Sequence, residues 1–203
     1  MTDAVHARNA VARFDEVEDV TDAERDDRRP TRRTEMTSAE LLADAFERVR
    51  EGVHHAVEGL TTEVLASRLD TEANSIAWLV WHLTRVQDDH VADITGEEQL
   101  WTALDWAQRF GLPFDVLDTG YGHGSREVAV VVADAATLIG YHDAVCDSTL
   151  RFVGHLRDAA LDRIVDADWD PPVTMGVRLV SVISDDLQHA GQAAFLRGVL
   201  ERR

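Results

Sequence analysis

The chain has 203 residues, 45% of them hydrophobic, which is enough for one domain with a sizeable core. Its formal charge is −18, from 38 acidic and 20 basic residues, and this acidic balance argues against nonspecific binding to nucleic-acid phosphates. No apolar run of about 18 residues occurs and the N-terminus lacks a signal-peptide pattern, so we expect a cytoplasmic protein without a membrane partner.

The basic residues and the cysteine content exclude some kinds of covalent link and metal site. Apart from histidine, every basic residue is an arginine, and the chain contains a single cysteine, Cys146. One cysteine cannot form an internal disulfide, and it cannot supply a cysteine-based zinc finger. Cys146 falls within an apolar helical pattern, which favours a place in the core over a catalytic role.

The first 35 residues differ in composition from the rest of the chain. Residues 16–35 are dense in Asp, Glu and Arg and contain few apolar side chains, so they can bury little surface. We therefore expect residues 1–35 to be an N-terminal extension, disordered or loosely docked, in which residues 4–17 allow a short helix. A domain that begins at Met36 would be complete, so the expected domain spans residues 36–203.

Two helices are predicted in the first half of the domain. The segment from Thr37 to Glu40 has a capping-box pattern and apolar residues recur at helical spacing after it, which predicts a helix over residues 38–58. Asn74 and Ser75 mark the start of a second helix, which extends to about residue 94 before a stop at Gly96. This second helix is apolar on nearly all sides at its start, as a buried bundle helix should be.

A long connection follows the second helix. Residues 97–110 are expected to hold a short helix, and the glycines of residues 118–124 predict a loop. Residues 127–132 suit either a helical turn or a short strand.

Two further long helices are predicted in the second half. They span residues 134–157 and 175–201, on either side of a break at Asp170-Pro171-Pro172. Four long helices without a βαβ pattern predict an all-α fold. The expected architecture is a four-helix bundle with a long connection between its second and third helices.

Asp185 and His189 lie four residues apart in the last predicted helix. A helix places both side chains on one face, about 6 Å apart along the axis, where a carboxylate and an imidazole can hold one divalent cation. His82, on the apolar second helix, offers a third ligand. A buried carboxylate is costly unless it is paired or bound to a metal. The plainer alternative is a hydrogen-bonded surface pair of Asp185 and His189 beside a structural His82.

Several segments resemble the DinB/YfiT-like metalloenzyme superfamily. The run NSIAWLVWHLTRVQD, residues 74–88, is similar to the second helix of that superfamily. The run DDLQHAGQ, residues 185–192, followed by Phe195 to Gly198, is similar to its fourth helix. Three further segments resemble an actinobacterial branch of the superfamily, close to the mycothiol S-transferases. They are residues 106–111, 119–123 and 169–174. The resemblance covers residues 37–203 and leaves out the N-terminal extension.

The resemblance implies a divalent metal held by His82, Asp185 and His189. Relatives more often carry histidine where Asp185 stands, and Asp186 is a neighbouring carboxylate. Two nitrogens and one oxygen suit zinc with an open position for catalysis, and the same set resembles the two-histidine, one-carboxylate site of non-haem iron. Zn²⁺ is therefore the first expectation, with Fe²⁺, Ni²⁺ and Mn²⁺ as open alternatives.

The resemblance further implies a thiol S-transferase that acts in detoxification. A low-molecular-weight thiol, mycothiol, would bind at the metal as a thiolate and attack an electrophile. Arg85 and Asp89, with Asp88 beside them, are expected to orient the thiol or to support the metal site. Tyr121 and His123 are the candidate catalytic residues, for substrate contact or proton transfer, or else they are plain turn residues.

Two other functions stay open at this point. The first is a metal-dependent hydrolase or thiol-dependent isomerase on the same bundle, in which water or a substrate carbonyl occupies the metal. The second is a non-enzymatic, stress-associated bundle whose metal is structural or absent. The expected partners are a small-molecule thiol and an electrophile, and a homodimer is compatible with a bundle of this type.

Overall fold

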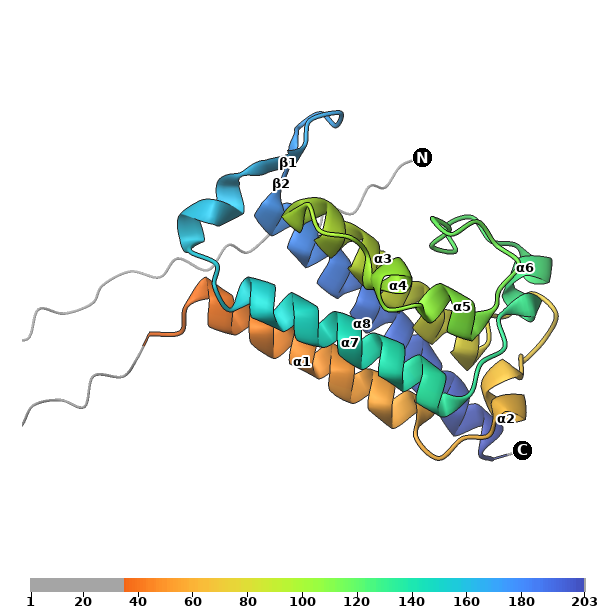
Figure 1. Ribbon diagram of the computed structural model, residues 1–203. Coiled ribbons are helices and arrows are strands. Elements are labelled where there is room, and N and C mark those ends of the chain that lie inside the picture. Colours follow the sequence, from red (N-terminus) through yellow and green to blue (C-terminus); the bar gives the residue numbers. More distant parts are fainter. Residues whose placement is uncertain (1–34, 203) are drawn as a thin grey trace, which may run out of the picture. The chain divides into compact units, whose positions relative to one another are not determined.

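The structure, a computed structural model, describes residues 35–202, and in this part of the chain four long helices form a bundle (Figure 1). The predicted extension and its short helix lie outside the described residues, apart from Glu35, so the division at Met36 stays a prediction. The predicted all-α bundle is confirmed. Its long helices are α1 (Ser38–Val57), α3 (Ile76–Thr95), α7 (Ala135–Val153) and α8 (Met175–Leu200).

Local side-chain chemistry sets the ends of these helices. The predicted capping box is present, since the Thr37 N–H donates to the Glu40 carboxylate at 2.8 Å and the Glu40 N–H donates to the Thr37 hydroxyl at 3.2 Å. Gly96, in the left-handed region with φ +76°, ends α3. Helix α7 ends at Val153, earlier than the predicted residue 157, because the backbone N–H groups of His155 and Leu156 donate to carbonyls three residues back instead of four.

Side-chain contacts define how the four helices run. Helices α1 and α8 are parallel, because Gly52 lies against Ala190 and, farther along both helices, Arg197 donates to the Glu58 carbonyl. Helices α3 and α7 are also parallel, since the Thr84 hydroxyl contacts His142 and Gln87 donates to Thr149 one to two turns later. Each parallel pair packs antiparallel against the other, and the helices pack in the ring α1–α8–α3–α7 (Figure 1).

The parallel arrangement of α3 and α7 requires the chain to cross the length of the bundle between them. This crossover holds three short helices, α4 (Leu100–Ala103), α5 (Trp106–Phe110) and α6 (Ser125–Val130). The single short helix predicted over residues 97–110 is thus divided in two at Asp105, which has a φ of +58°. The undecided segment at residues 127–132 belongs largely to α6.

The other two connections also carry short elements, which were not predicted. Helix α2 (Thr62–Ala66) follows α1, capped by Thr61. Between α7 and α8 lie the 3₁₀ helix η1 (Asp158–Asp162) and a hairpin of β1 (Ile164–Asp166) and β2 (Val173–Thr174), which pair antiparallel. The hairpin turn carries Trp169, whose side chain is exposed.

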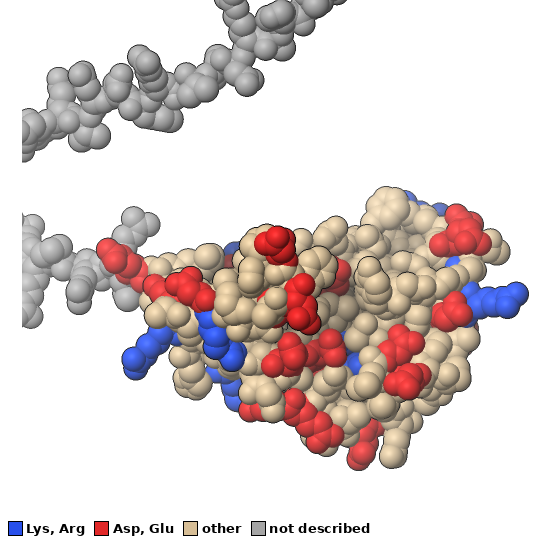
Figure 2. Space-filling model, turned by 90° about the horizontal axis from the view of Figure 1, so that it is seen from above, with Lys and Arg blue, Asp and Glu red and all other residues tan. Residues whose placement is uncertain are grey.

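The bundle buries a mostly apolar core. Cys146 lies in this core, as predicted. Its side chain is fully buried, and burial raises the pKa of the thiol to about 12. On the face shown in Figure 2, acidic side chains cover more of the surface than arginines do. Among the described residues, no helix is long and apolar enough to cross a membrane.

Candidate metal centre

Three side chains from two antiparallel helices converge at the α3–α8 contact. His82 comes from α3, and Asp185 and His189 come from α8, where the four-residue spacing puts both on one face. Each residue offers a ligand atom that lies within 4.8 Å of the other two. The His189 Nε2 is 3.6 Å from the Asp185 Oδ1, and the centroids of the two imidazole rings are 5.0 Å apart.

Both imidazole rings are oriented through their Nδ1 atoms. The Nδ1 of His82 contacts the Thr119 carbonyl oxygen at 2.5 Å, and the Nδ1 of His189 contacts the Gln192 Oε1 at 3.0 Å. Because a carbonyl oxygen only accepts, each Nδ1 donates to it, so Nε2 is the ring atom left to bind a metal. Burial also lowers the pKa of His82, which favours the neutral ring that a metal needs.

The two neighbouring carboxylates of α8 have different surroundings. Asp185 faces the histidines, and its Oδ2 is buried without a hydrogen-bond partner among the described residues. Asp186 points into the core, where it is fully buried and where burial raises its pKa well above the usual range. The geometry therefore groups Asp185, and not Asp186, with the histidines.

The donor set fits a divalent cation. An unpartnered, buried carboxylate oxygen would be costly without a positive charge to compensate it, and a cation bound with the two imidazole rings would supply that charge. Two nitrogens and one oxygen suit Zn²⁺ and also suit the non-haem iron type of site. We call His82, Asp185 and His189 the triad from here on.

The glycine-rich loop covers the triad at a point where only glycine fits. Gly120 has a φ of +91°, and a Cβ atom built on it would lie 2.9 Å from the Trp81 ring and 3.0 Å from the His82 Nδ1. This close approach lets the preceding residue, Thr119, present its carbonyl to His82. Sequence reasoning identified the loop by its glycines but did not foresee that contact.

Replacing Gly120 with alanine should therefore destabilise the protein more than the same change at Gly122. A Cβ at Gly122, where φ is +78°, would meet no atom within 4 Å, so only backbone strain of about 1 kcal/mol is expected there. At Gly120 the overlap with Trp81 and His82 adds about 1–3 kcal/mol. Denaturant unfolding of both variants measures the difference, and equal losses would show that the loop does not press on His82.

His123 anchors this loop through both ring nitrogens. The Trp78 indole N–H donates to the His123 Nδ1 at 3.2 Å, so the Nε2 carries the proton and donates to the Asp118 carboxylate at 3.0 Å. The Trp78 ring also stacks on His82, with centroids 4.7 Å apart. These contacts make His123 a positioning residue in this structure, with neither nitrogen free to exchange a proton with a substrate.

Arg85 lies in the core and not against a cavity. Its side chain is fully buried and donates to the carbonyls of Asp118 and Val116 at 3.2 and 3.4 Å. It also donates to Gln99 at 2.8 Å and to Tyr141 at 3.3 Å. The sequence left open whether Arg85 orients the thiol or supports the metal site, and its contacts fix the segment that leads into Thr119.

A cavity of about 630 Å³ opens beside the triad, with His82 and Asp185 in its wall. We call it the polar cavity, because three carboxylates line it, those of Asp89, Asp166 and Asp185. Arg178 also lines it and donates to Asp166 at 2.7 Å and to the His90 Nδ1 at 3.0 Å. Of the residues predicted to contact substrate, Asp89 and Tyr121 lie here, and the Tyr121 side chain is 93% exposed.

A helical bundle that groups two histidines and one carboxylate, with His82 and Asp185 in a cavity wall, is compatible with a divalent metal site. The family model of the mycothiol-S-transferases matches residues 41–202, and the chain belongs to this DinB/YfiT-like family. The crystal structure of a conserved protein from Enterococcus faecalis is similar, with 28% sequence identity and a TM-score of 0.76. That match covers 83% of this chain and 99% of the other. Comparison with curated proteins gave no match.

Proposed function

We propose that this protein is a metal-dependent S-transferase that conjugates mycothiol to electrophiles, as a step of detoxification. The observation that carries the proposal is the triad itself: Asp185, with one buried and unpartnered oxygen, lies beside two imidazoles, and His82 and Asp185 line a cavity. Membership in the mycothiol-S-transferase family supports the choice of thiol. Zn²⁺ is the preferred metal, because it accepts this donor set and keeps an open position.

In this proposal His82, Asp185 and His189 would hold the metal, and the metal would supply the positive charge that lowers the pKa of a substrate thiol. The Thr119 carbonyl and the Gln192 amide hold the two imidazoles in the tautomer that ligation needs. Asp89 and Tyr121, at the wall of the polar cavity, are placed to contact the rest of the thiol.

The chain offers no accessible thiol of its own for a covalent route. Cys146 is fully buried in the core, and its raised pKa keeps it protonated at neutral pH. The nucleophile must then come from the small-molecule substrate, and Cys146→Ala should keep its transferase activity.

The test combines metal analysis with a transfer assay on the purified protein. We expect one divalent ion per chain, and conjugation of mycothiol to bromobimane that stops on chelation and resumes when Zn²⁺ is added back. Full metal occupancy without thiol turnover would contradict the transferase and favour a metal-dependent hydrolase. Absence of divalent-ion binding would contradict both enzymatic functions.

A further inference from the structure

Trp169, on the hairpin turn, lines the polar cavity, and the proposed mechanism does not use it. We propose that Trp169 is a stacking platform for a polyhydroxylated ring, so that the hairpin end of the polar cavity binds the sugar-like part of the thiol. The inference rests on the proposed function, because it assigns a binding place to one part of mycothiol, whose thiol group is attached to polyhydroxylated rings.

The exposure of Trp169 is unusual among the tryptophans of this chain. The chain has five tryptophans, and the other four are at most 8% exposed, whereas Trp169 is 66% exposed. Tryptophan is usually well buried, because its ring is large and mostly apolar. An indole ring that lines a cavity and keeps most of its surface open offers a face on which a ligand can stack.

The hairpin is fixed to the bundle close to Trp169. Asp166, the last residue of β1, accepts a hydrogen bond from the Asp168 N–H at 3.1 Å. Its other carboxylate oxygen accepts from Arg178 of α8 at 2.7 Å, and this ion pair is partly buried. Trp169 follows Asp166 by three residues, so these contacts hold its ring at the cavity wall.

The polar cavity extends from the hairpin to the triad along two helices. Arg178 and Asp185 are seven residues apart on α8, and both line the cavity. Their separation along the helix axis is therefore about 10 Å. On α3, His90 and His82 are separated by a similar length, and Arg178 donates to the His90 Nδ1 at 3.0 Å. A ligand with its ring at Trp169 can thus extend its sulfur to the triad.

The charges of the cavity suit a neutral ligand with many hydroxyl groups. Among the described residues, three carboxylates and one guanidinium line it, so an anion would be repelled. Asp89 and Asp166 can accept hydrogen bonds, and the guanidinium of Arg178 has more N–H donors than its two contacts use. A hydroxyl group donates and accepts, so a polyol satisfies both kinds of partner, whereas an apolar ligand would satisfy neither.

The ring of a cyclic polyol complements the indole. Its hydroxyl groups project from the edge, and its faces carry C–H groups with a small positive charge. The face of an aromatic ring is negative, so it attracts those C–H groups. Stacking on Trp169 therefore leaves the hydroxyl groups free to reach the charged side chains of the same cavity.

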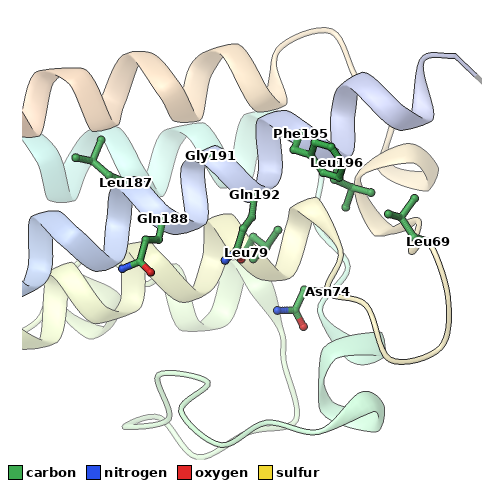
Figure 3. A pocket seen from close by; sticks show the side chains of 9 residues that line it. All are labelled: Leu69, Asn74, Leu79, Leu187, Gln188, Gly191, Gln192, Phe195 and Leu196. Atoms are coloured by element: carbon green, nitrogen blue, oxygen red, sulfur yellow. The ribbon is translucent and has the colours of Figure 1, made fainter. Parts of the chain in front are cut away.

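A second cavity provides the contrast, and Figure 3 shows its lining. It has a volume of about 530 Å³ and lies between α8, Leu79 of α3 and the segment before α3. It also carries an exposed aromatic ring, that of Phe195, which is 68% exposed. No charged residue of the described part of the chain lines it. Phe195→Ala is therefore the matched control, since it removes an equally exposed ring from a cavity that lacks charged partners for hydroxyl groups.

Calorimetric titration with N-acetylglucosaminyl-inositol tests the platform without metal or turnover. This probe has the rings and the sugar amide of mycothiol but no sulfur. We expect the wild type and Phe195→Ala to bind it alike, and Trp169→Ala to bind it about tenfold more weakly. Trp169→Phe keeps an aromatic face and should recover most of the affinity. In the wild type, the probe should also protect tryptophan emission from acrylamide, because only Trp169 is open to the quencher.

The transfer assay separates a binding role of Trp169 from a structural one. Trp169→Ala should raise the KM for mycothiol about tenfold and leave the KM for N-acetylcysteine, a thiol without such rings, unchanged. Its metal content and unfolding midpoint should equal those of the wild type. An equal rise in KM for both thiols would overturn the inference.

Equal probe affinity in Trp169→Ala and the wild type would overturn the inference, and so would the absence of probe binding by the wild type. An equal loss in Phe195→Ala would also overturn it, because the effect would not belong to the polar cavity. Probe binding that depends on Trp169, in a protein without thiol transfer, would remove the proposed function and keep the polyol site. Mycothiol transfer with an unchanged KM in Trp169→Ala would remove only the inference.

Discussion

Replacing His189 with alanine should abolish stoichiometric metal binding and lower the kcat/KM of thiol transfer by about a thousandfold or more. The change removes one of only three side-chain ligands in the triad and leaves Asp185 without its imidazole neighbour at 3.6 Å. Loss of a residue that merely orients a ligand costs about 10–100-fold in metal affinity, so loss of a ligand itself should cost more. Gln192→Leu, which removes only the orienting contact to His189, should fall in that smaller range.

The measurement is metal content after dialysis, together with the transfer rate at saturating Zn²⁺. His155→Ala is the matched control, because His155 is an exposed histidine outside the triad and the polar cavity. Its metal content and transfer rate should equal those of the wild type. A His189→Ala protein that keeps one metal per chain and normal turnover would show that the triad is not the metal site.

The second large effect is expected on stability, from Arg85→Met. Asp88 is buried, and Arg85 is its buried cationic neighbour, with a nitrogen–oxygen distance of 3.7 Å. Burial already raises the pKa of Asp88, although the N–H groups of Leu100 and Trp101 and the Tyr141 hydroxyl donate to its carboxylate. Removing the guanidinium leaves that carboxylate without its counter-charge, so the free energy of unfolding should fall by about 3–5 kcal/mol.

Two comparison variants give this stability prediction its scale. Tyr141→Phe removes one hydrogen bond to Asp88 and should lower the free energy of unfolding by about 1–2 kcal/mol. Arg48→Met breaks only the exposed pair with Asp44, so its unfolding midpoint should not change measurably. Denaturant unfolding gives the free energy of unfolding of all three variants. Equal unfolding midpoints for Arg85→Met and Arg48→Met would contradict a structural role of the buried guanidinium.

The long helices were predictable because their signals are local. The Thr37–Glu40 capping box and Gly96 each mark a helix end from a few neighbouring residues, and apolar residues at helical spacing predict the helix between such ends. The hairpin of β1 and β2 was not predicted, because strands this short depend on their pairing and on contacts with α8 rather than on their own sequence. The end of α7 was placed too late because Leu156 continues the apolar pattern past the last helical residue, Val153.

The candidate site was predictable only in part. Spacing alone related Asp185 to His189, whereas their meeting with His82 depends on how α3 packs against α8, and the resemblance to a known superfamily supplied that step. The sequence left open whether Arg85 orients substrate or supports the metal site, because burial of a charged side chain on an apolar helix cannot be read from the sequence. Two contacts of the imidazoles could not be predicted from the sequence. The contact of the Thr119 carbonyl with His82 joins a loop to a helix, and the contact of Gln192 with His189 belongs to no known motif.

Under the proposed function, in which the protein handles electrophiles, the absence of lysine and the burial of Cys146 have a consequence. Amines and thiols are the side chains that such reagents modify most readily. This chain has no lysine, and its one thiol is fully buried with a pKa raised to about 12. A catalyst built in this way resists alkylation by its own substrate, so repeated turnover should not inactivate it through those groups.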